Sequence, residues 1–112
     1  MALNTPLEAG ETVVRESRAN MQRGIESVGG HLYLTDKRLI FESHKLNVQR
    51  GASEIPLASV ESVAPAWTRF LGFIPLAKNS VAVGAGGAES RFVVPKRNEW
   101  VDAIDRQRGG AA

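Results

Sequence analysis

The stretch Gly29–Ser43, GGHLYLTDKRLIFES, has the pattern of a β-hairpin and decides the fold expected for the whole chain. Apolar and polar residues alternate on both sides of a turn at Asp36-Lys37, and alternating side chains point to opposite faces of a sheet. Because one register serves both arms, the pattern predicts a single buried face. The residues expected on that face are Leu32, Leu34, Leu39 and Phe41. We expect the opposite face, which carries Tyr33, and the Lys37-Arg38 tip to be solvated.

The length and composition indicate one folded domain. A chain of 112 residues is long enough for one packed core and too short for two. Hydrophobic residues make up 43% and charged residues 23%, which is typical of a globular protein. The 14 basic and 12 acidic residues leave a net charge of +2, too small a surplus to indicate nucleic-acid binding. The lack of cysteine excludes disulfides and cysteine nucleophiles, and it fits a reducing compartment.

The sequence carries no targeting or membrane signal. The first residues, MALNTPLEAGE, lack the basic and apolar regions of a secretory signal. No segment approaches the roughly 18 unbroken apolar residues that a membrane-spanning helix needs. We therefore expect a cytoplasmic protein, with peripheral attachment at the inner membrane face as the alternative.

Beyond the hairpin, the hydrophobic period of two predicts more strands before it changes to the period of a helix. The expected strands cover residues 12–19, 53–64 with a break near Ala58-Ser59, 78–84 and 89–94, with a further short strand around 46–49. Residues 20–28 read as a connection. The helix is expected over about 96–107, where Trp100, Val101 and Ile104 share one stripe. Six or seven antiparallel strands and one helix fit a small barrel or an orthogonal sandwich with the helix in its open end.

Three segments together resemble a GRAM domain, a member of the pleckstrin-homology-like superfold, and in particular its bacterial-type single-domain proteins. They are Gly29–Phe41 (GGHLYLTDKRLIF), Ile55–Val63 (IPLASVESV) and Arg91–Ile104 (RFVVPKRNEWVDAI). The segment Leu7–Asn20 is similar to the first strand of that family, so the resemblance covers nearly the whole chain. It implies two near-orthogonal antiparallel sheets, a partly open barrel, capped by one C-terminal helix with Trp100 in the open end. It also implies a module that binds lipids or proteins.

The chain length and the family resemblance together predict the domain organisation. We expect a single GRAM/PH-like domain over residues 1–112, with a core of about 7–108 and flexible tails at 1–6 and 109–112.

The basic residues of the first strands do not favour a phosphoinositide site. Members of the superfold that bind these headgroups place several lysines and arginines across the first two strands and the loop between them. Here that region offers Arg15, Arg18 and Arg23. Arg15 and Arg18 stand three apart on an expected strand, so they point to opposite faces and cannot approach one phosphate together.

The segment 66–77, AWTRFLGFIPLA, concentrates large apolar residues in an expected loop between two strands. In the simplest interpretation these side chains fill the domain's own core. If a patch stays exposed, it would contact a protein partner or a second copy, or enter a membrane interface, and exposed patches more often mark protein contacts. The candidate contact residues are Trp67, Arg69, Phe70, Leu71, Phe73, Ile74 and Lys78.

Other candidates for chemistry do not form a recognisable site. His31 and His44 lack acidic neighbours at metal-ligand spacing, and Gly84–Gly87 lacks the ending of a phosphate loop. No pair of titratable residues stands at a catalytic spacing, so we expect no enzyme, no cofactor, no metal site and no small-molecule substrate. Nucleic-acid binding is disfavoured because aromatic residues do not interleave with cations on one face.

The leading hypothesis is a non-enzymatic GRAM/PH-like interaction module that binds a protein partner or itself through the apolar loop 66–77. The alternative is a peripheral module for anionic membranes. The partner class that we favour is protein, including a homo-oligomer, over membrane lipid.

Overall fold

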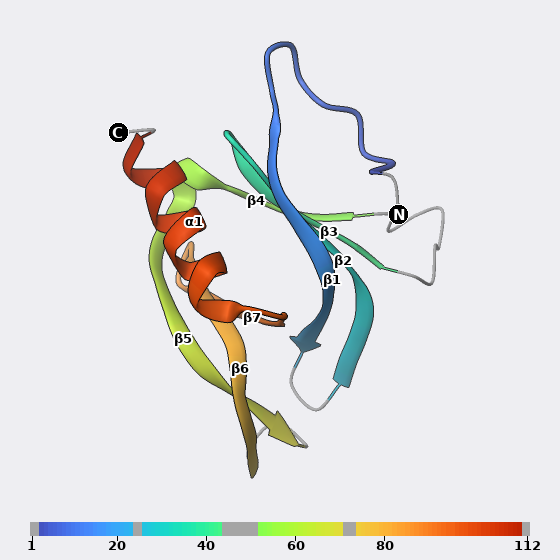
Figure 1. Ribbon diagram of the computed structural model, residues 1–112, viewed down its shortest axis with the longest axis vertical. Coiled ribbons are helices and arrows are strands. Elements are labelled where there is room, and N and C mark those ends of the chain that lie inside the picture. Colours follow the sequence, from blue (N-terminus) through green and yellow to red (C-terminus); the bar gives the residue numbers. More distant parts are fainter. Residues whose placement is uncertain (1–2, 24–25, 44–51, 71–73, 111–112) are drawn as a thin grey trace.

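The computed structural model describes residues 3–23, 26–43, 52–70 and 74–110, with backbone only for 23, 26, 52, 67–70, 74–79 and 110. These residues form seven strands, a short 3-10 turn and one helix (Figure 1). The elements are β1 (Val13–Arg23), β2 (Glu26–Thr35), β3 (Arg38–Ser43), β4 (Ala52–Pro56), η2 (Leu57–Ser59), β5 (Val60–Phe70), β6 (Ile74–Ala85), β7 (Ala88–Val93) and α1 (Arg97–Gly110).

All seven strands belong to one antiparallel sheet with the order β4-β3-β2-β1-β7-β6-β5. The halves β1–β4 and β5–β7, which correspond to the two expected sheets, are joined where Asn20 pairs with Val93 and Gln22 with Arg91. They face each other across the interior in Figure 1. The edge strands β4 and β5 do not pair with each other, so the sheet is not closed. This confirms the mainly β, partly open architecture with a C-terminal helix.

The hairpin forms in the expected register. Leu32 pairs with Phe41 and Leu34 with Leu39 on either side of the turn. Each of these four side chains is at most 2% exposed. The alternation in the sequence therefore identifies the core face of β2 and β3 correctly.

The helix contributes the other large part of the core. Trp100 and Ile104 are fully buried, and α1 packs against β5 and β6. The Trp100 indole Nε1 donates a hydrogen bond to Ser17 Oγ at 3.2 Å, and the Arg15 guanidinium lies 5.3 Å from the centre of the ring. A buried indole with its N–H satisfied and a cation over its face is a stable arrangement. The core role expected for Trp100 is confirmed.

Several element boundaries differ from the sequence expectation. Residues 20–28 are mostly strand, because β1 continues to Arg23 and Met21 pairs with Val28 across the hairpin. Residues 20–28 are mostly polar and have little strand propensity of their own, so pairing with a neighbouring strand stabilises their extended conformation. The helix continues to Gly110. The strand expected around 46–49 lies outside the described residues.

The face of the β2–β3 hairpin opposite the core face is buried, which corrects the expectation of a solvated face. Tyr33 is 1% exposed and Glu42 is 2% exposed. The N-terminal arm, which we define as residues 3–12, lies along this face and bonds to it. The Asn4 and Thr5 amides donate to the Glu42 carboxylate at 3.1 and 2.7 Å. Segments that precede the first strand therefore contribute to the packing of β3.

Candidate functional site

The segment 66–77 is largely strand rather than loop, which corrects the expected secondary structure. Strands β5 and β6 pair Thr68 with Ala77, Arg69 with Pro75 and Phe70 with Ile74. We call residues 67–70 and 74–79 the β5–β6 ribbon. Among the candidate contact residues, five lie on this ribbon: Trp67, Arg69, Phe70, Ile74 and Lys78. Leu71 and Phe73 lie outside the described residues.

The β5–β6 ribbon extends past the third strand of its half of the sheet. Pairing between β6 and β7 reaches the pair Ser80 and Val93, after which the chain turns into α1. Within the described residues, β6 from 74 to 79 pairs with β5 alone. Figure 1 shows this ribbon projecting beyond the other strands. At its base, Arg97 of α1 donates to the Ala66 carbonyl at 2.7 Å and fixes β5 to the helix.

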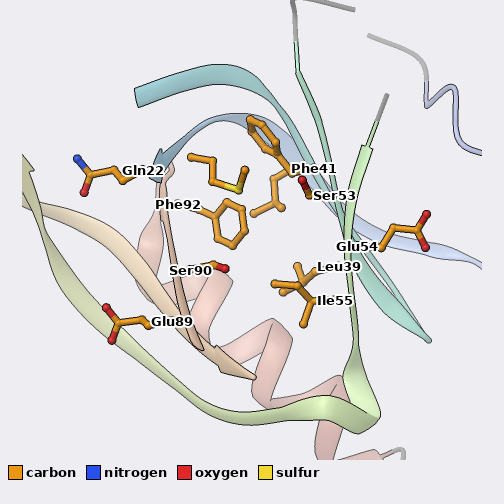
Figure 2. A pocket seen from close by; sticks show the side chains of 11 residues that line it. Gln22, Leu39, Phe41, Ser53, Glu54, Ile55, Glu89, Ser90 and Phe92 are labelled. Atoms are coloured by element: carbon orange, nitrogen blue, oxygen red, sulfur yellow. The ribbon is translucent and has the colours of Figure 1, made fainter. Parts of the chain in front are cut away.

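A cavity of about 360 Å³ lies between the two halves of the sheet (Figure 2). Its walls are apolar side chains from β1, β2, β3, β4 and β7. They are Met21, Leu32, Leu39, Phe41, Ile55 and Phe92. The Phe41 and Phe92 rings approach from opposite halves with their centres 6.0 Å apart. Figure 2 shows Leu39, Ile55 and Phe92 pointing into the same space.

The periphery of the cavity is polar. Ser53 and Glu54 come from β4, and Glu89 and Ser90 come from β7. In Figure 2 the carboxylates of Glu54 and Glu89 point away from the centre. Glu54 is bonded to Arg38 at 2.6 Å and Glu89 to Arg91 at 2.7 Å, so both negative charges are balanced by arginines outside the cavity lining.

A buried ion pair fixes the N-terminal arm to the hairpin. Glu11 Oε2 accepts hydrogen bonds from Arg38 Nε at 2.8 Å and from Thr35 Oγ1 at 2.6 Å. The bond from Arg38 lowers the pKa of Glu11 from its ordinary value of 4.5 to about 2, against the opposing effect of burial. The same contact raises the pKa of Arg38 further. Arg38 is therefore a structural residue, and the expectation of a solvated tip is wrong for it.

The described residues contain no arrangement that suggests metal binding. No group of three His, Asp or Glu residues in the described part of the chain is placed to hold an ion. His31 is buried beside Tyr33, with its Nε2 3.4 Å from Glu16 Oε1. His44 lies outside the described residues. No helix in the described part of the chain is long and apolar enough to cross a bilayer.

Arg15 and Arg18, two of the three arginines of β1, are separated as expected. Arg15 is half-buried against Trp100 and contacts Glu99 at 3.2 Å. Arg18 is exposed elsewhere on the strand. Because Arg15 is engaged by the helix, the pair does not form a shared phosphate site.

The cavity and the arm are the features that sequence patterns did not reveal. Alternation identified Leu32, Leu39 and Phe41 as inward-facing, but it cannot show whether opposing walls meet. Glu11 and Arg38 are 27 positions apart, and no local pattern links them.

Comparison with solved structures shows that the chain has a pleckstrin-homology-like fold. The N-terminal PH domain of Vps36 is 15% identical, with a TM-score of 0.71, 95% of this chain covered and 85% of that one. The human ARAP2 N-terminal PH domain is 11% identical, with a TM-score of 0.68 and coverages of 97% and 88%. The C-terminal domain of an unknown protein from Leishmania infantum is 18% identical, with a TM-score of 0.69 and coverages of 89% and 86%.

The chain belongs to the GRAM domain family, whose model matches residues 2–76. No curated protein matches it. Domains of the GRAM and PH-like type mediate interactions with lipids or proteins. This confirms the family and the general class of module that the sequence motifs indicated.

Proposed function

We propose that this chain is a non-enzymatic interaction module that binds a protein, either a partner or a second copy of itself, through the β5–β6 ribbon. The observation that supports this proposal is the pairing of β6 from 74 to 79 with β5 alone among the described residues. A two-stranded hairpin is marginally stable in water unless a third strand or another layer packs against it. A protein surface would supply that layer.

The sequence of the ribbon suits a protein contact. It carries Trp67 and Phe70 on β5 and Ile74 on β6, and Leu71 and Phe73 stand between them in the sequence. Aromatic residues are enriched in interfaces, and burying one large apolar side chain contributes about 1.5–3 kcal/mol. The segment also carries Arg69 and Lys78, and charged residues at the rim of an interface mainly affect association rates.

Anionic membrane is the second candidate, because the same segment combines aromatic residues with Arg69 and Lys78. Tryptophan favours the headgroup region, and cations near it are attracted to anionic lipid. We rank membrane second because the net charge is only +2 and Arg15 is occupied by α1.

Sedimentation equilibrium and vesicle co-sedimentation together test the proposal. The variant is Trp67→Ser with Phe70→Ser, and the matched control is Val14→Ser, which removes an exposed apolar side chain from β1. We expect concentration-dependent association that the double variant loses and the control retains. If the protein stays monomeric at every concentration, self-association is excluded. Strong uptake by phosphatidylserine vesicles, lost in the double variant, would replace the protein proposal with the membrane one.

A further inference from the structure

We propose that the cavity between the two halves of the sheet is a binding site for a small uncharged amphiphile. The cavity is partly open to solvent, and its volume of about 360 Å³ falls in the lower part of the range of ligand pockets, roughly 300–1,000 Å³. This inference does not depend on the function proposed for the β5–β6 ribbon.

The walls select an apolar body. Met21, Leu32, Leu39, Phe41 and Phe92 are each at most 5% exposed, and together with Ile55 they form the apolar walls of the cavity, which is partly open to solvent. The apolar side chains around this space lack the dispersion contacts that a filled core would give them. A ligand with an apolar body supplies those contacts and removes this apolar surface from water. A cavity of about 150 Å³ accommodates benzene, so this one suits a body of about two aromatic rings or an equivalent alkyl chain.

The periphery selects against a charged ligand. No lysine or arginine lines the cavity in the described part of the chain, so a buried anionic group would meet no opposite charge. Arg38 and Arg91, which bind Glu54 and Glu89 of the lining, are not among the lining residues. The hydroxyl of Ser90 on β7 both donates and accepts hydrogen bonds, which suits a neutral polar group at one end of the ligand. Anionic lipid headgroups do not fit this chemistry.

Two fluorescent probes with the same skeleton test the inference. N-phenyl-1-naphthylamine is neutral, and 1-anilinonaphthalene-8-sulfonate adds one negative charge. We expect the neutral probe to bind the full chain saturably, one molecule per chain, and at least tenfold more tightly than the sulfonate. We also expect 1-decanol to displace it. Absence of saturable binding, or equal affinity for the two probes, would overturn the proposal.

Cavity-filling variants locate the site. Ile55→Trp places an indole in the cavity from β4, and Val14→Trp adds the same group to an exposed position outside it. The first should reduce the affinity for the neutral probe at least tenfold, and the second should leave it unchanged. If Ile55→Trp does not fold by circular dichroism, Ser90→Phe fills the cavity from β7 and replaces it. Unchanged binding in a folded filling variant contradicts the assignment.

Discussion

The Nε atom of Arg38 lies 2.8 Å from Oε2 of Glu11, and this contact joins the N-terminal arm to β3. The Glu11 side chain is fully buried and that of Arg38 is 12% exposed. Arg38 also donates to Glu54 Oε1 at 2.6 Å and to the Pro6 carbonyl at 2.8 Å. One guanidinium therefore connects the arm, β3 and β4, and the arm is part of the folded unit.

Replacing Glu11 with Gln should strongly destabilise the fold. The change removes the negative charge opposite a largely buried Arg38, and breaking such a pair costs about 3–5 kcal/mol. Because Arg38 keeps its bond to Glu54, we expect a loss of stability at the lower end of this range, about 3 kcal/mol. Urea denaturation measures the free energy of unfolding. The control Glu8→Gln, at a side chain 63% exposed, should change it by less than about 0.5 kcal/mol. Equal effects of the two changes would contradict the structural role of Glu11.

The same carboxylate should make stability depend on pH in acid. The pKa of Glu11 is lowered from 4.5 to about 2 by the hydrogen bond from Arg38. Because the folded-state pKa lies below the unfolded one, this carboxylate stabilises the fold above about pH 4.5, and the effect is lost as the pH falls toward 2. The full effect is on the order of 3 kcal/mol. The difference between wild type and Glu11→Gln, measured by urea denaturation at a series of pH values, should shrink through this window. A constant difference would refute the assignment.

The parts of the fold that sequence reasoning predicted are those with a local signal. Alternation over Gly29–Ser43 identified the hairpin, its register and its core face, and the helical stripe identified Trp100 as buried. Both depend on the spacing of neighbouring residues. The hydrophobic period also predicted most of the other elements, and the resemblance to a known family supplied their arrangement in two near-orthogonal sheets capped by the helix.

The parts that were missed depend on contacts between distant residues. The burial of Glu42 follows from the arm, 37 positions earlier, and no period in the sequence reports such a contact. The extension of β1 to Arg23 follows from pairing with β2 and β7. The segment 66–77 was expected as a loop between two strands, although a proline such as Pro75 is tolerated where a strand has few partners.

Replacing Thr5 with Val should release part of the arm. Thr5 Oγ1 donates to Glu42 Oε2 at 2.6 Å, and Glu42 is 2% exposed. A lost hydrogen bond to a buried carboxylate costs about 1.5–3 kcal/mol. Thermal and urea unfolding should both report this loss, with Thr12→Val, at an exposed residue, as the matched control. If Thr5→Val is as stable as the control, the Thr5 hydroxyl does not help to hold the arm on β3.

Replacing Gly30 with Ala should destabilise the hairpin, although alanine is the smallest possible change. A Cβ atom at Gly30 would collide with the backbone carbonyl oxygen of Glu42 and would lie 2.7 Å from the Phe41 ring. The carbonyl belongs to the neighbouring strand β3 and cannot rotate away, so the strands must separate. Overpacking of this kind costs about 1–3 kcal/mol.

The matched control for that change is Gly109→Ala. A Cβ atom there has no neighbour within 4 Å, and the residue lies in α1. Alanine favours helix by up to about 1 kcal/mol over glycine, so this variant should be neutral or slightly more stable. The free energies of unfolding in urea should therefore change in opposite directions or differ clearly in size. If Gly30→Ala unfolds at the same urea concentration as Gly109→Ala, β2 and β3 do not approach as closely at Gly30 as the structure indicates.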